Sequence, residues 1–287
     1  MNKIKSKLNK ILLYTILAGA SFFGGNNLIK NNLNAEIESE IPSTSKIEDY
    51  KVNDSKYWLV HIRQAHMIPD LEKIANDISR IDDSNKIKIA KSLQEIFENT
   101  NIVQKDIYDI LSYLIKNKKI SEVREESVFE GEETSNEFIT KEYLKNNKNL
   151  NDLLRIWNKD KTKDYNEKIK YLPNATWVLC SENKIKLLPA SNKKESFIAW
   201  ESQKKELIYE GRENYLLEII SKDKNPLQIV VYGGSHNLKD NIEQWNKKFP
   251  NKMFSFKEIT PENYDECVKN IEKNTEEINK IMHSAYK

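Results

Sequence analysis

The chain has 287 residues, enough for one large domain or two small ones, and 38% of them are hydrophobic and 31% charged. Its 46 basic and 44 acidic residues leave a net charge of only +2, and the lysines are scattered among glutamates. This balance gives no support for a nucleic-acid partner, which would require a clustered basic surplus.

The N-terminus has the pattern of an export signal. Four lysines (Lys3, Lys5, Lys7 and Lys10) precede the apolar segment 11–25 (ILLYTILAGASFFGG) with its small residues at 18–20. This order is typical of a secretory signal peptide, and the segment is shorter than the roughly 20 residues of a membrane span. We therefore predict that residues 1–25 are a signal peptide or, as the alternative, a membrane anchor within residues 7–29. The protein would be exported or membrane-anchored, and extracytoplasmic.

Residues 26–54 are polar, with few aromatics and no sustained hydrophobic period. Such a segment cannot bury enough apolar surface to fold, so we predict a disordered linker. The folded domain would then comprise residues 55–287. Its two cysteines, Cys180 and Cys267, stand in apolar helical contexts without metal-site spacing, which indicates buried free thiols.

The first two predicted strands each end in an ionisable group. The first occupies 57–66 (YWLVHIRQAH), where alternation places Gln64 and His66 at the end of one face. The second, at 127–131 (SVFEG), ends in Glu130 before a glycine.

The segment 227–245 (LQIVVYGGSHNLKDNIEQW) organises the rest of the chain. Residues 229–232 are an uninterrupted apolar run, typical of an inner strand buried on both faces. Gly233 and Gly234 end the strand, and Asn237 can cap the helix that follows. His236 therefore lies between a strand end and a helix N-terminus, where open α/β sheets bind ligands. A structural histidine is the alternative, but the glycines that clear space before it favour a site.

The other elements complete an alternating pattern. They are helices at 71–81, 86–97 and 102–116, charged helices within 135–171, a strand at 184–188, helices over 195–209 and from 211 onward, a strand at 253–259 and a terminal helix. Strands interleaved with helices indicate an α/β fold. We predict one domain with a central mixed or mostly parallel sheet covered by helices.

The candidate site residues stand at predicted strand ends or helix starts. They are His66 and Glu130 at strand ends, His236 after the glycines, and Arg212-Glu213 at a helix start. Two histidines and a carboxylate are a familiar ligand set for Zn²⁺ or Mn²⁺, so His66, Glu130 and His236 are predicted metal ligands. Arg212 could stabilise an oxyanion or pair with a carboxylate such as Glu213 or Glu130. The alternative for Arg212 and Glu213 is a solvated helix turn. Further predicted binding residues at this site are Gln64, Gly233 and Gly234.

Four short segments carry a family resemblance: RQAH at 63–66, FEG at 129–131, REN at 212–214 and VVYGGSH at 230–236. Together they resemble the superfamily of TraB/PrgY pheromone-shutdown proteins, Tiki proteases, erythromycin esterases and ChaN-like haem-uptake proteins. Its members share two Gly-x-x-His motifs and acidic and arginine positions on an α/β core. Residues 233–236 match one motif in full. Arg63 stands where the other motif has glycine, and Ser191 stands where relatives have glutamate.

The resemblance covers roughly residues 57–264 and implies an exported hydrolase of peptidase or esterase type. In it His66, Glu130 and His236 hold or flank a metal-activated water, Glu213 relays protons and Arg212 stabilises the oxyanion. The substrate would be a peptide or a small molecule, and the oligomeric state is open. One alternative is a non-catalytic protein that binds haem or a peptide in the same pocket. Another is an interaction protein held at the cell surface by its anchor.

Overall fold

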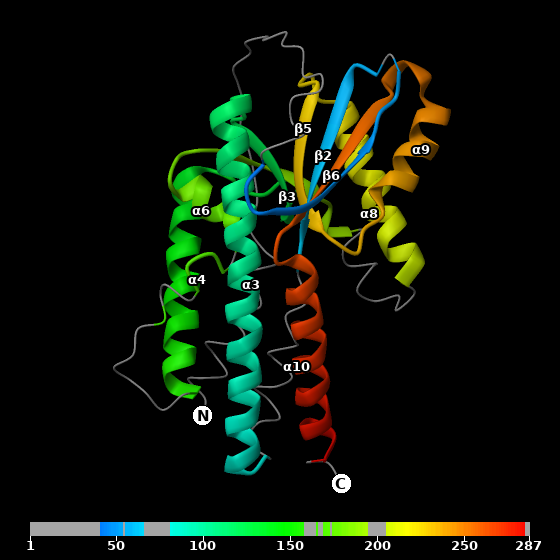
Figure 1. Cartoon of the computed structure of the whole chain (residues 1–287). Helices are drawn as coiled ribbons and strands as arrows, with labels where there is room; N and C mark the ends of the chain where they lie inside the picture. Colours follow the sequence, from blue (N-terminus) through cyan, green and yellow to red (C-terminus); the bar gives the residue numbers. More distant parts are fainter. Residues whose placement is uncertain are drawn as a thin grey trace.

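The computed structural model describes residues 41–53, 55–65, 81–157, 165, 169–172, 174–194 and 205–284. In this part of the chain a six-stranded sheet lies between helices and forms a single α/β domain (Figure 1). The predicted fold class is therefore confirmed. The predicted signal peptide or anchor and all but the last residue of the predicted helix at 71–81 lie outside the described residues. None of the described helices is long and apolar enough to cross a membrane.

The strands of the sheet follow the order β1-β6-β2-β5-β3-β4. They are β1 (Thr44–Tyr50), β2 (Tyr57–Gln64), β3 (Glu122–Phe129), β4 (Lys186–Ser191), β5 (Leu227–Gly233) and β6 (Phe254–Pro261). All neighbours are parallel except β1 and β6. The carboxyl ends of the five parallel strands therefore meet at one edge of the sheet, where residues that follow these strands come together.

β5 is an inner strand, as the apolar run predicts. It pairs with β2 on one side and with β3 on the other. The side chains of residues 229–232 are at most 3% exposed, because helices cover both faces of the sheet. Pairing with β2 continues as far as Gly233, which lies opposite Gln64.

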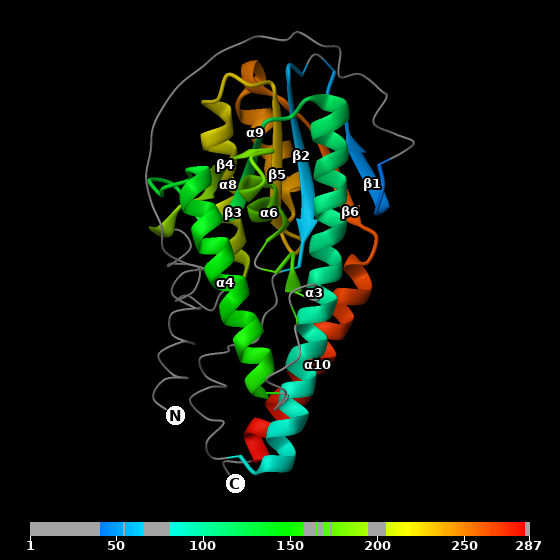
Figure 2. The same ribbon diagram turned by 90° about the vertical axis from the view of Figure 1, so that its left-hand side faces the viewer.

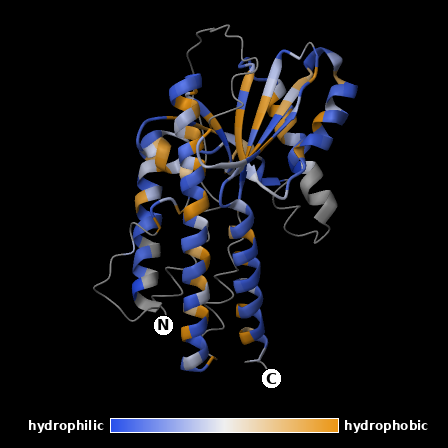
Figure 3. Ribbon diagram, in the orientation of Figure 1, coloured by the Kyte–Doolittle hydropathy of each residue, from blue (hydrophilic) through white to orange (hydrophobic). Residues whose placement is uncertain are grey.

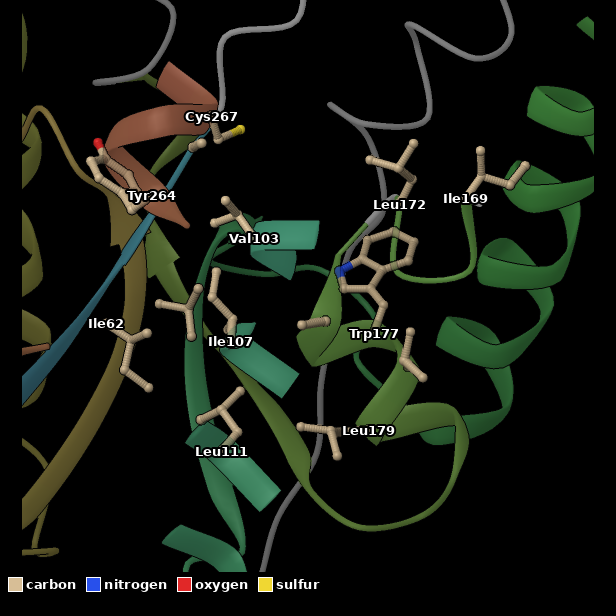
Figure 4. Close-up of a cluster of buried hydrophobic side chains, with 14 of the residues drawn as sticks. Ile62, Val103, Ile107, Leu111, Ile169, Leu172, Trp177, Leu179, Tyr264 and Cys267 are labelled. Atoms are coloured by element: carbon tan, nitrogen blue, oxygen red, sulfur yellow. The ribbon is translucent and has the colours of Figure 1, made fainter. Parts of the chain in front are cut away.

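Two helical layers cover the sheet. One contains α3 (Asp83–Lys118), α4 (Asn136–Trp157), α6 (Ala175–Ser181) and α10 (Tyr264–Ser284), and the other contains α8 (Lys205–Ser221) and α9 (Leu238–Lys248). The short 3₁₀ helix η2 (Pro250–Lys252) leads into β6. Apolar residues concentrate in the strands, while the helices present mostly hydrophilic residues (Figure 3). In the first layer, side chains of α3, α6 and α10 belong to one apolar cluster with Ile62 of β2 (Figure 4), and both cysteines are buried free thiols, as predicted.

Helices α3, α4 and α10 continue past the carboxyl-end edge of the sheet (Figure 1 and Figure 2). α3 has 36 residues, which corresponds to about 54 Å at 1.5 Å per residue. The predicted break between 97 and 102 is wrong. Thr100 there is buried and its hydroxyl donates to the Ile96 carbonyl at 2.8 Å, so this polar position continues the helix instead of ending it.

Helix α8 also runs without a break, from Lys205 to Ser221. The predicted helix start at 211 is wrong, because a single glycine inside a helix costs only about 1 kcal/mol and tertiary packing overrides that preference. Arg212 and Glu213 consequently lie in the middle of a helix that packs on the sheet, and not in an exposed first turn.

Part of the predicted linker belongs to the sheet. Residues 44–50 form β1, which pairs antiparallel with β6 from Thr44 opposite Pro261 to Tyr50 opposite Phe256. The linker prediction is wrong for these residues because an edge strand needs little apolar sequence of its own. Ile47 packs against the core, and the charged residues around it suit an exposed edge.

Deleting β1 should therefore destabilise the domain. A chain that begins at Ile41 and one that begins at Lys51 differ by the residues that pair with β6. We expect the shorter chain to have a free energy of unfolding lower by about 2–4 kcal/mol, since several backbone hydrogen bonds of about 1 kcal/mol each are lost. Guanidinium unfolding followed by circular dichroism measures the difference. Equal stabilities would contradict the placement of β1 in the sheet.

Candidate functional site

His236 and Glu213, two of the predicted site residues, form a buried pair. His236 follows β5 in the turn before α9, and Glu213 projects from α8 on the same side of the sheet. Nδ1 of His236 lies 2.9 Å from Oε1 of Glu213, and the same oxygen accepts the backbone N–H of Asn237 at 3.1 Å. The two residues are 5% and 3% exposed. A proton shared at Nδ1 fixes the orientation of the ring and leaves Nε2 on its opposite side.

Nε2 of His236 faces Glu126, a residue that the sequence analysis missed. Glu126 lies in β3, and its Oε1 is 3.5 Å from Nε2. The same oxygen accepts a hydrogen bond from Nη2 of Arg212, and Oε2 accepts the backbone N–H of Gly233 at 2.6 Å. One carboxylate, 8% exposed, thus contacts an imidazole, a guanidinium and a backbone amide. Charged and hydrogen-bonded partners of this kind are what a buried carboxylate requires.

Glu126 was missed because the strand was predicted too short, at 127–131, whereas β3 spans Glu122–Phe129. The charged sequence Arg124-Glu125-Glu126 does not resemble an inner strand. Alternation places Arg124 and Glu126 on the side of α8, where Arg124 donates to Asp223 at 2.7 Å and to Gln228 at 2.9 Å. Three charges before the apolar pair Val128-Phe129 were the available signal, since charges in a buried strand need partners.

Arg212 pairs with a carboxylate, as predicted, but its partner is Glu126 rather than Glu213 or Glu130. Its side chain is only 16% exposed, so the alternative of a solvated helix turn is wrong. The guanidinium also lies over the ring of Tyr232, 5.6 Å from the ring centre. A planar guanidinium can contact a carboxylate and an aromatic face together, which an ammonium group does poorly.

The charges of the cluster favour protonated His236. Burial, the largest influence, lowers its pKa, but the hydrogen bonds to Glu126 and Glu213 outweigh burial and hold the pKa above the ordinary value of 6.5. Burial also acts against the charge of Arg212, whose pKa Glu126 nonetheless raises above its usual range. With His236 protonated, two cations balance two carboxylates in these four side chains.

The two predicted glycines form the turn that carries His236. The N–H of Gly234 donates to the Gln64 carbonyl at 2.9 Å, which extends the pairing of β5 with β2 by one residue. A Cβ on Gly234 would lie 1.9 Å from the hydroxyl oxygen of Tyr264. A larger residue at this position would force the Tyr264 ring, which Arg63 covers, to move.

A second polar network supports the same turn from β2 and β6. Arg63, which departs from the resembled motif, donates from Nη2 to the Gly234 carbonyl at 2.7 Å. His61 is fully buried, with its ring nitrogens 3.0 Å from Glu258 Oε2 and 3.1 Å from the Tyr232 carbonyl. Burial raises the pKa of Glu258, but the contacts with His61 and Arg63 outweigh it and hold that pKa below its ordinary value. These contacts fix the backbone on both sides of the β5 terminus.

The other predicted site residues do not join the described contacts of His236. Glu130 is exposed, since β3 ends one residue earlier, and it accepts from the Tyr215 hydroxyl at 2.5 Å. The side chain of Gln64 is buried, and its Oε1 has no hydrogen-bond partner among the described residues. His66 lies outside the described residues.

The predicted metal set therefore stays a prediction. In the described part of the chain, no three His, Cys, Asp or Glu side chains are grouped to hold a metal ion. The described contacts of Glu130 and His236 do not overlap, and the third proposed ligand, His66, is not described.

Comparisons of the chain with protein-family models, with curated proteins and with solved structures find no match. The resemblance to the TraB superfamily is neither supported nor contradicted by them. The chemistry of the site is therefore inferred from its own geometry.

The raised pKa of His236 predicts how stability depends on pH. The folded state binds this proton more tightly than the unfolded state, so the stabilisation is fully present below about pH 6.5 and is lost as pH rises through the folded-state pKa. The free energy of unfolding of the wild type, minus that of His236→Gln, should therefore be largest near pH 6 and fall toward pH 9. Denaturant titrations across this range measure it. A difference that grows with pH would contradict the assigned charge state.

Proposed function

We propose that the protein is a hydrolase of ester or peptide bonds in which His236 and Glu213 form the proton-transfer pair. The observation that carries the proposal is the buried series Glu213–His236–Glu126–Arg212. It lies beside the carboxyl ends of β3 and β5, the position at which α/β sheets bind ligands. An imidazole oriented by a carboxylate, next to a group that stabilises negative charge, recurs in hydrolytic sites on unrelated folds.

Each member of the series has a role in this mechanism. Neutral His236 accepts a proton from the attacking water at Nε2, and Glu213 stabilises the imidazolium that results. Arg212 stabilises the negative charge that develops on the substrate oxygen. Glu126 holds Arg212 in place and, through its contact with Gly233, couples the arginine to the turn that carries His236. Because the pKa of His236 is raised, the neutral base accumulates only as pH rises above 6.5.

Two further predictions belong to the proposal. We propose that the hydrolase acts outside the cytoplasm, because residues 1–25 have the basic and apolar pattern of a signal peptide, with residues 7–29 as the anchor if the segment is retained. The Zn²⁺ or Mn²⁺ ion is a separate proposal, and no step above passes through it. Metal analysis of the purified protein tests the ion, and a Soret absorbance band would instead favour the haem-binding alternative.

Substitutions within the series should reduce hydrolysis and leave the fold intact. With p-nitrophenyl acetate and a mixture of fluorogenic peptides as probes, we expect His236→Gln to lower kcat by about 10²–10⁴-fold, the usual contribution of general base catalysis. Arg212→Lys should cost about 10²–10³-fold, because lysine loses the planar fork that faces Glu126 and the substrate oxygen. Circular dichroism checks folding, and initial rates measure activity.

The chain offers a matched control for the histidine substitution. His283 lies exposed near the end of α10, with Nδ1 2.9 Å from the Asn279 carbonyl. His283→Gln should hydrolyse the probes at the wild-type rate. Hydrolysis that is equally fast in the wild type and in His236→Gln would remove the proposed base.

A further inference from the structure

Three buried polar atoms lie beside the His236 cluster without a close hydrogen bond to it. The Tyr232 hydroxyl is fully buried and, like Nε of Arg212, has no hydrogen-bond partner among the described residues. The hydroxyl of Ser191, fully buried at the end of β4, makes a long contact of 3.5 Å with Nη2 of Arg212 and adjoins the Tyr232 hydroxyl. More than about 90% of buried polar groups in folded proteins are paired, so such atoms require a reason.

These atoms border the imidazole. The Tyr232 ring meets the His236 ring edge-on, with ring centres 4.3 Å apart. Arg212 lies over the Tyr232 ring, and both Arg212 and Ser191 are close enough to the phenol oxygen to influence its pKa, although neither contact has the alignment of a regular hydrogen bond. The three groups come from β4, β5 and α8, so the fold and not a local turn brings them together.

All three groups can act as hydrogen-bond donors. Burial, the largest influence, raises the pKa of Tyr232 well above its ordinary value, so the hydroxyl keeps its proton at neutral pH. Ser191 offers an O–H and Arg212 an N–H. Buried donor atoms without a well-aligned acceptor suit an oxygen atom that gains negative charge during a reaction.

We propose that the hydroxyls of Tyr232 and Ser191, with Nε of Arg212, form the oxyanion-binding part of the site and that Tyr232 is its principal donor. This inference rests on the proposed function and adds the substrate class, an uncharged acyl compound. With neutral His236, the two carboxylates and Arg212 leave the four side chains with one net negative charge, so an anionic reacting group would be repelled.

For an ester, the proposed hydrolysis consumes only water. Water adds to the carbonyl carbon while His236 takes one of its protons, and the π electron pair of the carbonyl moves to the oxygen, which the three donors stabilise. When the carbonyl re-forms, the bond to the leaving oxygen breaks, and His236 returns the proton to the alcohol. Ester and water give acid and alcohol, and no other reactant is consumed.

The test is Tyr232→Phe in the full chain, because it removes one oxygen and keeps the ring against His236. With p-nitrophenyl acetate we expect kcat to fall by about 10²–10³-fold, as for the loss of one oxyanion donor, while KM changes little. The midpoint of unfolding should stay the same or rise, since the lost hydroxyl had no partner to leave behind. The midpoint of the pH–rate profile should not move, because His236 is retained.

Tyr108→Phe is the matched control. The Tyr108 hydroxyl, on α3, donates to Glu182 at 2.8 Å and accepts from Lys184 at 2.8 Å, and these contacts do not include His236. This variant should keep the wild-type kcat and lose some stability. The opposite responses of the two tyrosines distinguish a functional hydroxyl from a structural one.

Two further results separate the oxyanion-binding role of Tyr232 from the proposed hydrolase activity. Hydrolysis that depends on His236, together with a wild-type kcat in Tyr232→Phe, would refute the donor role of Tyr232 and leave the proposed hydrolase supported. The donor role would also be refuted if the unfolding midpoint of Tyr232→Phe fell more than that of Tyr108→Phe. If no hydrolysis depends on His236, the proposed hydrolase is refuted. Calorimetric binding of p-nitrophenyl methylphosphonate, a tetrahedral anion, then tests the three donors at pH 6, where protonated His236 leaves the four side chains without net charge. Binding at least tenfold weaker in Tyr232→Phe supports them; equal binding, or none, overturns them.

Discussion

The site depends on one buried carboxylate, that of Glu126. It lies in the interior of the domain, where an isolated charge would be unfavourable by several kcal/mol. Its contacts come from three parts of the chain: Arg212 in α8, the backbone of Gly233 at the end of β5, and the ring of His236 in the following turn. The same carboxylate therefore stabilises the folded arrangement and, together with Glu213, raises the pKa of the histidine.

Sheet topology makes these contacts possible. β3 and β5 are parallel neighbours although about a hundred residues separate them, because the chain passes through β4 and α8 before it returns between β2 and β3. α8 packs on the face to which Glu126 points, so it can supply both Arg212 and Glu213 from consecutive positions. The glycine turn at the end of β5 is held by the Gln64 backbone and by Arg63, which fixes the approach of His236.

The part of the site that local patterns determine was predictable from the sequence. The apolar run 229–232, the two glycines and His236 follow one another directly, so strand, turn and ligand position could be inferred together. Arg212 and Glu213 could be proposed from residue type, but not their partners, because a carboxylate on a distant strand holds the arginine. Glu126 was missed because a charged residue is expected to face solvent, and the sequence does not show that α8 covers this position. β1 was missed for the related reason that β6 supplies its hydrogen bonds.

The most direct test of the role of Glu126 is an NMR titration of the His236 ring in the wild type and in Glu126→Gln, with ¹⁵N-labelled histidine. The wild-type pKa should lie above 6.5, and it should fall in the variant, because burial lowers the pKa and one of the two carboxylates that oppose burial is gone. The other three histidines serve as internal references, and Glu213 should keep its bond to Nδ1. A His236 pKa that is unchanged by the substitution would show that Glu126 does not control the histidine, and it would contradict this account of the site.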